Sequence, residues 1–141
     1  MPVHAIAYAS QAVPGLSAGE VEGIVHDAAS HNLMAGVTGV LLYDGSRFLQ
    51  YIEGPADGVA SAYGRIRNAT SHMEMMELGR GMTGSRRFPY WSMHCIPVES
   101  EELVEAIRAE WAALGPSPAV TRASLSGVDR VAALVAPHVN H

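Results

Sequence analysis

The chain has 141 residues, and 48% of them are hydrophobic, which is sufficient for the core of one domain with a short extension. The formal net charge is −5, and all nine basic residues are Arg that form no basic stripe, so we expect no nucleic-acid surface. The apolar runs are too short to cross a membrane, and the N-terminus lacks the pattern of a secretory signal. The single cysteine, Cys95, excludes an internal disulfide, and we expect a cytoplasmic protein.

Runs of apolar, β-branched and aromatic residues predict five strands, at residues 2–9, 37–43, 47–52, 72–78 and 86–93. Asp44-Gly45 lies between the second and third strands and is typical of a tight hairpin turn. Helical spacing of apolar residues predicts four helices, one from Ser17 to Gly36 and others over residues 57–68, 99–114 and 124–135. The first begins with the capping box Ser17-x-x-Glu20.

The order β-α-β-β-α-β-β contains the split βαβ pattern of a ferredoxin-like sheet. We therefore predict an α+β fold, a ferredoxin-like two-layer sandwich with a mixed sheet, followed by two C-terminal helices. The expected division is a first unit over residues 1–96 and a helical extension over residues 97–141. The apolar faces of the extension either pack on the open face of the sheet or meet a partner, which would favour a homo-oligomer.

Three polar side chains are expected among apolar neighbours, where each needs a hydrogen-bond partner. Asn32 lies near the end of the first helix and Gln50 lies in a strand, on the same face as Phe48. Each also has an ordinary interpretation, since Asn is common at helix ends and a strand Gln can face solvent. Tyr8 near the end of the first strand is by default a core residue, but its hydroxyl could reach Gln50.

Other residues leave the same choice between packing and ligand binding open. Ile24 and Ile66 on the first two helices are core residues or the two walls of a slot for a planar ring. Arg65 lies on a solvated helix face or recognises a carbonyl or phosphate. Trp91 and Met93 alternate on the last strand and are core residues or neighbours of a ligand.

The sequence offers no conventional enzyme or metal motif. The seven His show no ligand spacing, and there is no HExxH or Cys/His cluster, so no metal site is expected. A nucleophile elbow, a P-loop and a GxGxxG turn are also missing from the sequence, so we expect no enzyme activity.

Several stretches, in this order, resemble the BLUF domain, the family of blue-light sensors that use FAD. They are YAS at residues 8–10, GVTGVLLYDGSRFLQYIEGP at 36–55, RI at 65–66, His72, and RRFPYWSM at 86–93. The resemblance covers roughly residues 2–95 and implies that FAD binds between the first two helices. It implies that Tyr8 is the photochemical donor of an electron and a proton, and that the amide of Gln50 rearranges after excitation.

The resemblance also implies the remaining contacts. Trp91 and Met93 match the switch residues of the last strand. The expected cofactor-binding residues are Ile24, His31, Asn32, Phe48, Gln50, Arg65, Ile66 and His72. One stretch departs from the family pattern, because Ala69 and Ser71 replace an acid and an Arg before His72. This weakens the expected anchoring of the cofactor tail and leaves FMN and riboflavin open as alternatives to FAD.

Three functions remain in competition. The first is a short blue-light photoreceptor without an attached output enzyme, acting through a downstream protein partner or a homo-oligomer. The second is a BLUF-like interaction module that has lost flavin binding, and the evidence for it is the departure from the family pattern at Ala69 and Ser71. The third is a small ferredoxin-like enzyme of the acylphosphatase type, but residues 11–17 lack the basic, glycine-rich loop that would hold a phosphate.

Overall fold

The computed structural model of the protein describes residues 2–112, 114 and 126–139. Within them, five strands form one mixed sheet in the order β4-β1-β3-β2-β5. The strands are β1 (Val3–Ala12), β2 (Thr38–Tyr43), β3 (Arg47–Gly54), β4 (His72–Thr83) and β5 (Cys95–Pro97). Neighbouring strands are antiparallel except β2 and β5, which run parallel.

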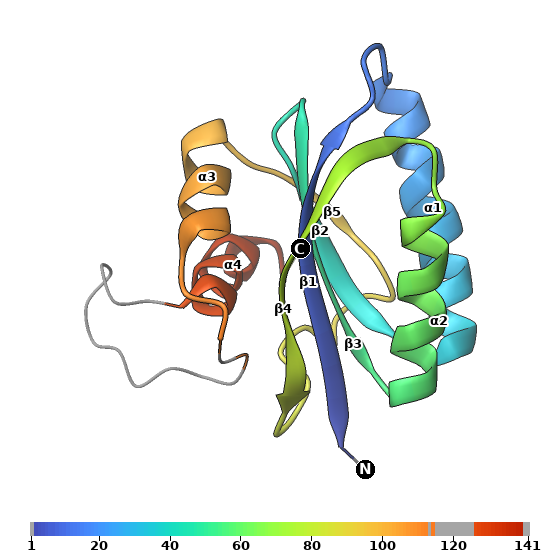
Figure 1. The fold of residues 1–141 in the computed structure, drawn as a ribbon, viewed down its shortest axis with the longest axis vertical. Helices are drawn as coiled ribbons and strands as arrows, with labels where there is room; N and C mark the ends of the chain where they lie inside the picture. Colours follow the sequence, from blue (N-terminus) through green and yellow to red (C-terminus); the bar gives the residue numbers. More distant parts are fainter. Residues whose placement is uncertain (1, 113, 115–125, 140–141) are drawn as a thin grey trace.

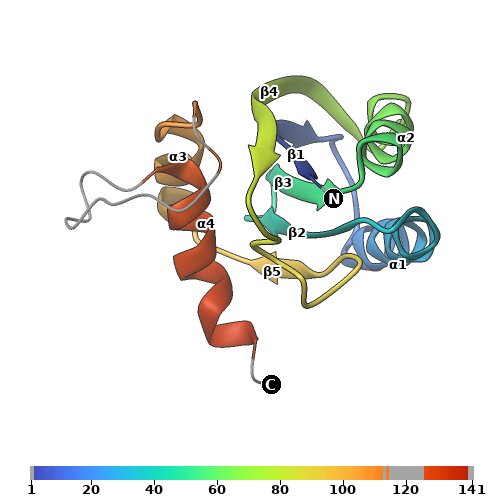
Figure 2. The same ribbon diagram turned by 90° about the horizontal axis from the view of Figure 1, so that it is seen from below.

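Helices cover both faces of this sheet. Figure 1 shows α1 (Ala18–Ala35) and α2 (Ala56–Arg67) side by side on one face. The opposite face is covered by α3 (Ser100–Arg108) and α4 (Gly127–Val135), which is followed by a short 3-10 turn (Ala136–His138), as the view in Figure 2 confirms. The predicted ferredoxin-like α+β fold with C-terminal helices is therefore confirmed. The C-terminal helices pack on the open face of the sheet, which was one of the two expected alternatives.

Each face of the sheet has its own apolar core, because alternate residues of a strand point to opposite faces. On the α1/α2 face, Phe48 and Ile52 of β3 pack with residues such as Val59 of α2. On the α3/α4 face, Leu49 and Tyr51 of the same strand pack with residues of both C-terminal helices. A strand buried on both faces explains why adjacent residues of β3, Phe48 with Leu49 and Tyr51 with Ile52, are apolar.

Local signals in the sequence account for the ends of the first elements. The Ser17 hydroxyl accepts from the backbone N–H of Glu20 at 3.1 Å, and the Glu20 carboxylate accepts from the N–H of Ser17 at 2.9 Å. This is the predicted capping box. Gly36 ends α1 in the left-handed conformation with φ 73°, which glycine adopts without steric cost. The Asp44 carboxylate accepts two backbone N–H groups of the hairpin turn.

The strand predicted over residues 86–93 is wrong: this segment is irregular, and β5 lies at Cys95–Pro97. Two causes are visible. Pro89 cannot donate a ladder hydrogen bond, and the N–H groups of Arg87 and Phe88 are taken by the carboxylate of Glu53. The segment still lies along β2, since Trp91 O accepts from the N–H of Gly39.

Several further boundaries differ from the prediction, since β1 runs to Ala12 and β3 to Gly54. The helix predicted over residues 99–114 ends at Arg108, because Trp111 turns into the core and its Nε1 donates to the carbonyl of Ala106 at 2.9 Å. Strand β4 extends to Thr83. Gly79 lies within the strand, where the absence of a side chain lets the backbone of Trp111 come close, and it does not form a turn. In the last predicted helix, residues 124–125 lie outside the described residues and α4 begins at Gly127. Among the helices that the structure describes, none is both long and apolar enough to span a membrane.

Candidate functional site: a slot between two helices

A cavity lies between the paired helices α1 and α2 and the sheet beneath them. Its volume is about 440 Å³, including the part at its mouth that is open to solvent. Apolar side chains form most of the wall, with Tyr8, Gln50, Ser71 and His72 as the polar residues. The full lining is Tyr8, Ile24, Val25, Ala28, Leu41, Phe48, Gln50, Ile66, Ala69, Ser71, His72 and Met93.

The pairing of β1 with β3 places the two central polar groups together. Tyr8 and Gln50 are direct cross-strand partners, and both are buried, with 4% and 5% of their surface exposed. The Tyr8 hydroxyl donates a hydrogen bond to Gln50 Oε1. The sequence had left a solvent-facing Gln50 open, and the structure excludes that alternative.

The other end of the Gln50 amide has a much weaker partner. Gln50 Nε2 donates to the thioether Sδ of Met93 at 3.5 Å, and a thioether sulfur is a weak acceptor. The amide is therefore held firmly through its oxygen and loosely through its nitrogen. A ligand in the cavity that offered a carbonyl oxygen would compete readily with the sulfur for this N–H.

Tyr8 is a protonated phenol in this environment. Burial is the main cause that raises its pKa well above the ordinary value, and the nearby Tyr63 adds to the effect. The phenolate is thus disfavoured at any physiological pH. The hydroxyl proton can leave along its hydrogen bond to Gln50 only if another change, such as loss of an electron from the ring, makes the phenol more acidic.

One buried polar atom beside the cavity lacks a partner among the described residues. His72 Nε2 is 2.8 Å from the carbonyl oxygen of Ile66, while Nδ1 of the same ring is buried without a hydrogen bond. The centroids of the His72 and Tyr8 rings are 5.7 Å apart. An unsatisfied ring nitrogen at the wall of an apolar cavity is the kind of group that a polar heterocyclic ligand would satisfy.

Asn32 lies beside the cavity rather than on its wall. Its side chain is buried, and Nδ2 donates to the backbone carbonyl of Ser92 at 2.8 Å. This hydrogen bond holds the backbone of Ser92, the residue before Met93, against the last turn of α1. The side chain of Asn32 therefore makes a tertiary contact in addition to its place at the helix end. Its contact with a ligand remains a prediction.

The structure brings together Tyr8, Ile24, Phe48, Gln50, Ile66, His72 and Met93 of the predicted site. It does not place His31, Arg65 or Trp91 on the cavity wall: the first two are exposed on their helices. The Trp91 ring stacks on His94, with 4.4 Å between centroids, and packs against the core of the α3/α4 face.

Sequence reasoning missed two wall residues, Val25 and Leu41, as ligand neighbours. Val25 could have been found, since it lies one residue after Ile24 on the apolar face of α1. Leu41 pairs with Gln50 across β2 and β3, a relation that requires the strand register. Ala69 and Ser71, which depart from the family pattern in the sequence, line the cavity, as does Ala28.

The fold and the cavity define the class of the protein: a ferredoxin-like domain with an apolar slot for a flat ligand. The walls are half-buried aliphatic side chains, and an amide, a phenol and an imidazole converge from the sheet. Across the described part of the chain, no three His, Cys, Asp or Glu side chains are grouped as a metal site. A tricyclic ring with carbonyl and ring-nitrogen groups, such as a flavin, fits these residues, and the unpaired Nδ1 of His72 favours such a ligand.

Residues 3–94 match the family described as BLUF, sensors of blue-light using FAD. The chain therefore belongs to the BLUF family, and its cofactor is FAD. It is 31% identical over 90 residues to the blue light- and temperature-regulated antirepressor BluF of Escherichia coli, covering 64% of this chain and 22% of that protein. It is 30% identical over 84 residues to the photoactivated adenylate cyclase subunit beta of Euglena longa, covering 60% of this chain and 10% of that protein.

Solved structures agree with this assignment. The dark-state structure of BlrB, a BLUF protein, aligns with a TM-score of 0.72 at 26% identity and covers 97% of both chains. Klebsiella pneumoniae BlrP1 with FMN and cyclic diGMP aligns with a TM-score of 0.64 at 30% identity, covering 74% of this chain and 29% of that one. The similarity to the longer proteins thus lies in a sensor domain that is a minor part of their length.

Proposed function

We propose that this protein is a blue-light photoreceptor whose signal begins as a rearrangement of hydrogen bonds around Tyr8 and Gln50. The observation that carries the proposal is the buried hydrogen bond from the Tyr8 hydroxyl to Gln50 Oε1 at the cavity wall. Membership of a blue-light-sensing family supports it from a second direction.

Each residue of the slot has a role in this proposal. Ile24 of α1 and Ile66 of α2 would hold the two faces of a bound ring and exclude water, while Phe48 closes the slot from the sheet. His72 Nδ1 and the Gln50 amide supply polar contacts. Asn32 fixes the backbone at Ser92 and faces the polar edge of the ring, with His31 beside it at the helix end. Arg65, exposed near the end of α2, contacts the cofactor tail.

A bound flavin would supply the blue-light absorption and, in its excited state, an acceptor for one electron from a nearby phenol. Loss of that electron makes Tyr8 strongly acidic, and its hydroxyl proton moves to Gln50 Oε1 along the existing hydrogen bond. Gln50 then rotates or tautomerises, which is easy because Met93 Sδ restrains its nitrogen only weakly. The electron and the proton return to Tyr8, so no covalent bond of the protein is permanently changed.

The rearranged Gln50 would offer a better hydrogen-bond donor to a carbonyl of a bound ring than before. A donor at that carbonyl lowers the transition energy, so absorption shifts slightly to the red. The residues next to Gln50 respond, and Met93 and the half-buried Trp91 are the candidates on the following segment. The signal then passes to a downstream protein partner or to another subunit of a homo-oligomer through the C-terminal helices.

The experiment is an absorption spectrum of the protein, purified in the dark, before and after blue light. We expect a flavin spectrum with a reversible red shift in the wild type. Tyr8→Phe should retain the bound flavin and lose the shift, because it removes the proton donor to Gln50. Tyr63→Phe is the matched control, since its ring lies 6.3 Å from that of Tyr8 but its hydroxyl bonds Glu77 instead, and it should keep the shift.

Two outcomes would contradict the proposal. An unchanged photocycle in Tyr8→Phe would exclude the assigned role of the Tyr8 hydroxyl. A colourless wild type that cannot be reconstituted with FAD would instead favour a BLUF-like interaction module without flavin. The evidence for this alternative is that Ala69 and Ser71 of the slot replace an acid and an Arg of the family pattern.

A further inference from the structure

Residues 86–94 connect the two faces of the sheet. At the slot, Met93 Sδ accepts from Gln50 Nε2 at 3.5 Å, and the carbonyl of Ser92 accepts from Asn32 Nδ2 at 2.8 Å. Backbone hydrogen bonds hold the same stretch to β2, where the N–H of Leu41 donates to His94 O at 2.9 Å. Any displacement of Met93 must therefore be shared by its neighbours along the chain.

The beginning of this segment is fixed by a fully buried carboxylate. Glu53 at the end of β3 has 0% of its surface exposed. One carboxylate oxygen accepts from the backbone N–H of Arg87 at 2.9 Å and from the Tyr51 hydroxyl at 3.2 Å, and the other accepts from the N–H of Phe88 at 2.6 Å. Burial of a carboxylate is costly unless such donors are held in place, so the position of residues 87–88 is tightly specified.

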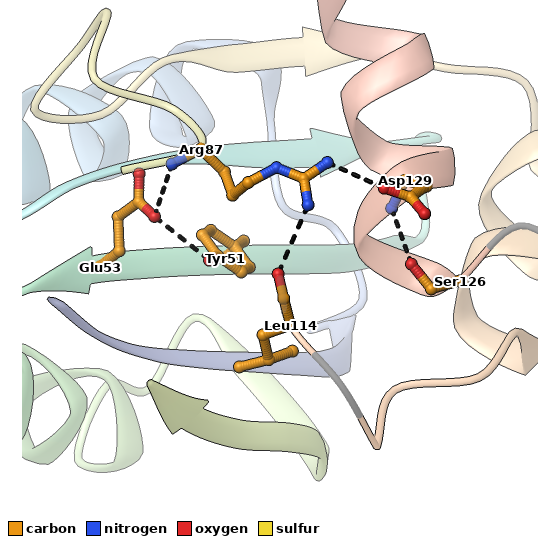
Figure 3. A network of polar contacts seen from close by, with 6 residues as sticks. All are labelled: Tyr51, Glu53, Arg87, Leu114, Ser126 and Asp129. Atoms are coloured by element: carbon orange, nitrogen blue, oxygen red, sulfur yellow. Dashed lines mark hydrogen bonds and ion pairs between the residues drawn. The ribbon is translucent and has the colours of Figure 1, made fainter. Parts of the chain in front are cut away.

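The side chain of Arg87 continues from this point to the C-terminal helices (Figure 3). Its guanidinium donates to Asp129 Oδ1 of α4 at 2.9 Å and to the carbonyl of Leu114 at 3.5 Å. The two side chains of the ion pair are only 14% and 13% exposed, so solvent screens it much less than a surface pair. Asp129 Oδ2 is buried and has no hydrogen bond among the described residues. The carboxylate therefore depends on Arg87, through Oδ1, for compensation of its burial.

We propose that Glu53 and Arg87 are positioning residues of the light-sensing site, which link the place of Met93 beside Gln50 to the place of Asp129 on α4. The inference rests on the proposed function, because it names the route by which that site reaches the C-terminal helices. The carboxylate of Glu53 fixes the beginning of the segment 86–94, at residues 87–88. Near the other end of the segment, Met93 lies at the slot. The Arg87–Asp129 ion pair attaches α4 to the same segment.

The linkage has a consequence in both directions. If movement of Met93 changes the strain on the Arg87–Asp129 pair, then removing that pair must change the energy of Met93 in its two arrangements. A substitution on α4, on the far side of the sheet from the slot, should therefore alter the environment of Met93 and the return of the lit state to the dark state. A purely structural ion pair would affect only the packing of α4.

The test compares Asp129→Asn with Glu105→Gln. Asp129→Asn keeps the size of the side chain and removes the charge that Arg87 binds. Glu105→Gln is the matched control, because Glu105 pairs with Arg130 between α3 and α4 at 3.3 Å and has no bond to residues 86–94. Two quantities are measured: the NMR shift of the ¹³C-labelled Met93 methyl in the dark, assigned with Met93→Leu, and the rate of dark recovery after blue light.

We expect Asp129→Asn to move the Met93 methyl resonance and to change the recovery rate by about twofold or more, the range typical of coupled residues. Asp129→Glu, which retains the charge, should return both quantities toward the wild type. Glu105→Gln should leave both unchanged, as should the methyl of Met34, which is 90% exposed on α1, in every variant.

The proposal is overturned if Asp129→Asn leaves the Met93 resonance and the recovery rate unchanged, or if Glu105→Gln changes them equally. Glu53→Gln provides a second test if Asp129→Asn fails to fold, since it should move the Met93 methyl by weakening the anchor at residues 87–88. The methyl comparison needs no light. A wild type that binds flavin but shows no red shift would therefore contradict the proposed function, and the methyl comparison would still test the linkage.

Discussion

Gly127, the first residue of α4, lies against the indole ring of Trp111, and its replacement by Ala should weaken the packing of α4 on the sheet. A Cβ added at Gly127 would overlap the ring atoms Cδ2, Cε2 and Nε1 of Trp111. The ring is 5% exposed and belongs to the core of the α3/α4 face, so it cannot simply swing into solvent.

Three terms decide the sign of the effect. The gain in helix propensity from Gly to Ala is at most about 1 kcal/mol. Overpacking a core of this kind costs typically about 1–3 kcal/mol. Displacement of the ring also breaks the 2.9 Å hydrogen bond from Trp111 Nε1 to the carbonyl of Ala106, which contributes about 1 kcal/mol. The clash therefore outweighs the propensity, and the free energy of unfolding should fall by about 1–3 kcal/mol.

The assays are urea and thermal unfolding followed by Trp fluorescence, together with amide hydrogen exchange of α4. Gly127→Ala should lower the melting temperature by roughly 3–10 °C and reduce exchange protection in α4. Gly23→Ala is the matched control, because Gly23 is also helical but an added Cβ meets nothing within 4 Å. That variant should gain about 0.5–1 kcal/mol. A Gly127→Ala protein as stable as Gly23→Ala would refute the packing argument.

Three further results are expected. Gln50→Leu should bind flavin with no light-induced red shift, because the rearranging amide is gone; a normal shift in absorption difference spectra would contradict this. Burial raises the pKa of both Tyr8 and Tyr51, so their stabilising contribution is fully present below the unfolded-state pKa of about 10 and is lost as pH rises above it. Unfolding monitored between neutral pH and pH values above 10 should therefore show stability falling only in the alkaline range, and a loss already at neutral pH would argue against these shifts. Because uncharged Ala69 and Ser71 line the mouth of the slot, chromatography of cofactor released from the purified protein should show FMN and riboflavin beside FAD, whereas FAD alone would indicate that other residues select the tail.

The elements with strong local signals could be predicted from the sequence. The capping box at Ser17 and the hairpin turn at Asp44-Gly45 act within a few residues, so their consequences do not depend on the rest of the fold. The order of elements then led to the ferredoxin-like sheet, and Tyr8 and Gln50 became cross-strand partners within it. The family resemblance supplied their candidate roles, which spacing alone had left open.

The segment at residues 86–93 could not be predicted because long-range contacts shape it. Its alternating aromatic and apolar residues favour a strand, but Glu53, more than thirty residues earlier, takes the N–H groups that a strand would need. The sequence left open whether Trp91 or Met93 lies next to the cavity. Trp91 packs on the opposite face, since the irregular backbone changes the alternation of side chains. The early end of α3 has a similar origin in the packing of Trp111.

The three-residue connection at Asp44–Ser46 also determines which chemistry reaches each face of the sheet. Gln50 faces the slot and Tyr51 faces the C-terminal helices because of their alternation along β3. Inserting or deleting one residue in this connection, with the strands otherwise unchanged, would send the amide into the apolar core and the tyrosine into the slot. Length variation at this hairpin tip should therefore be poorly tolerated, although the tip itself is exposed to solvent.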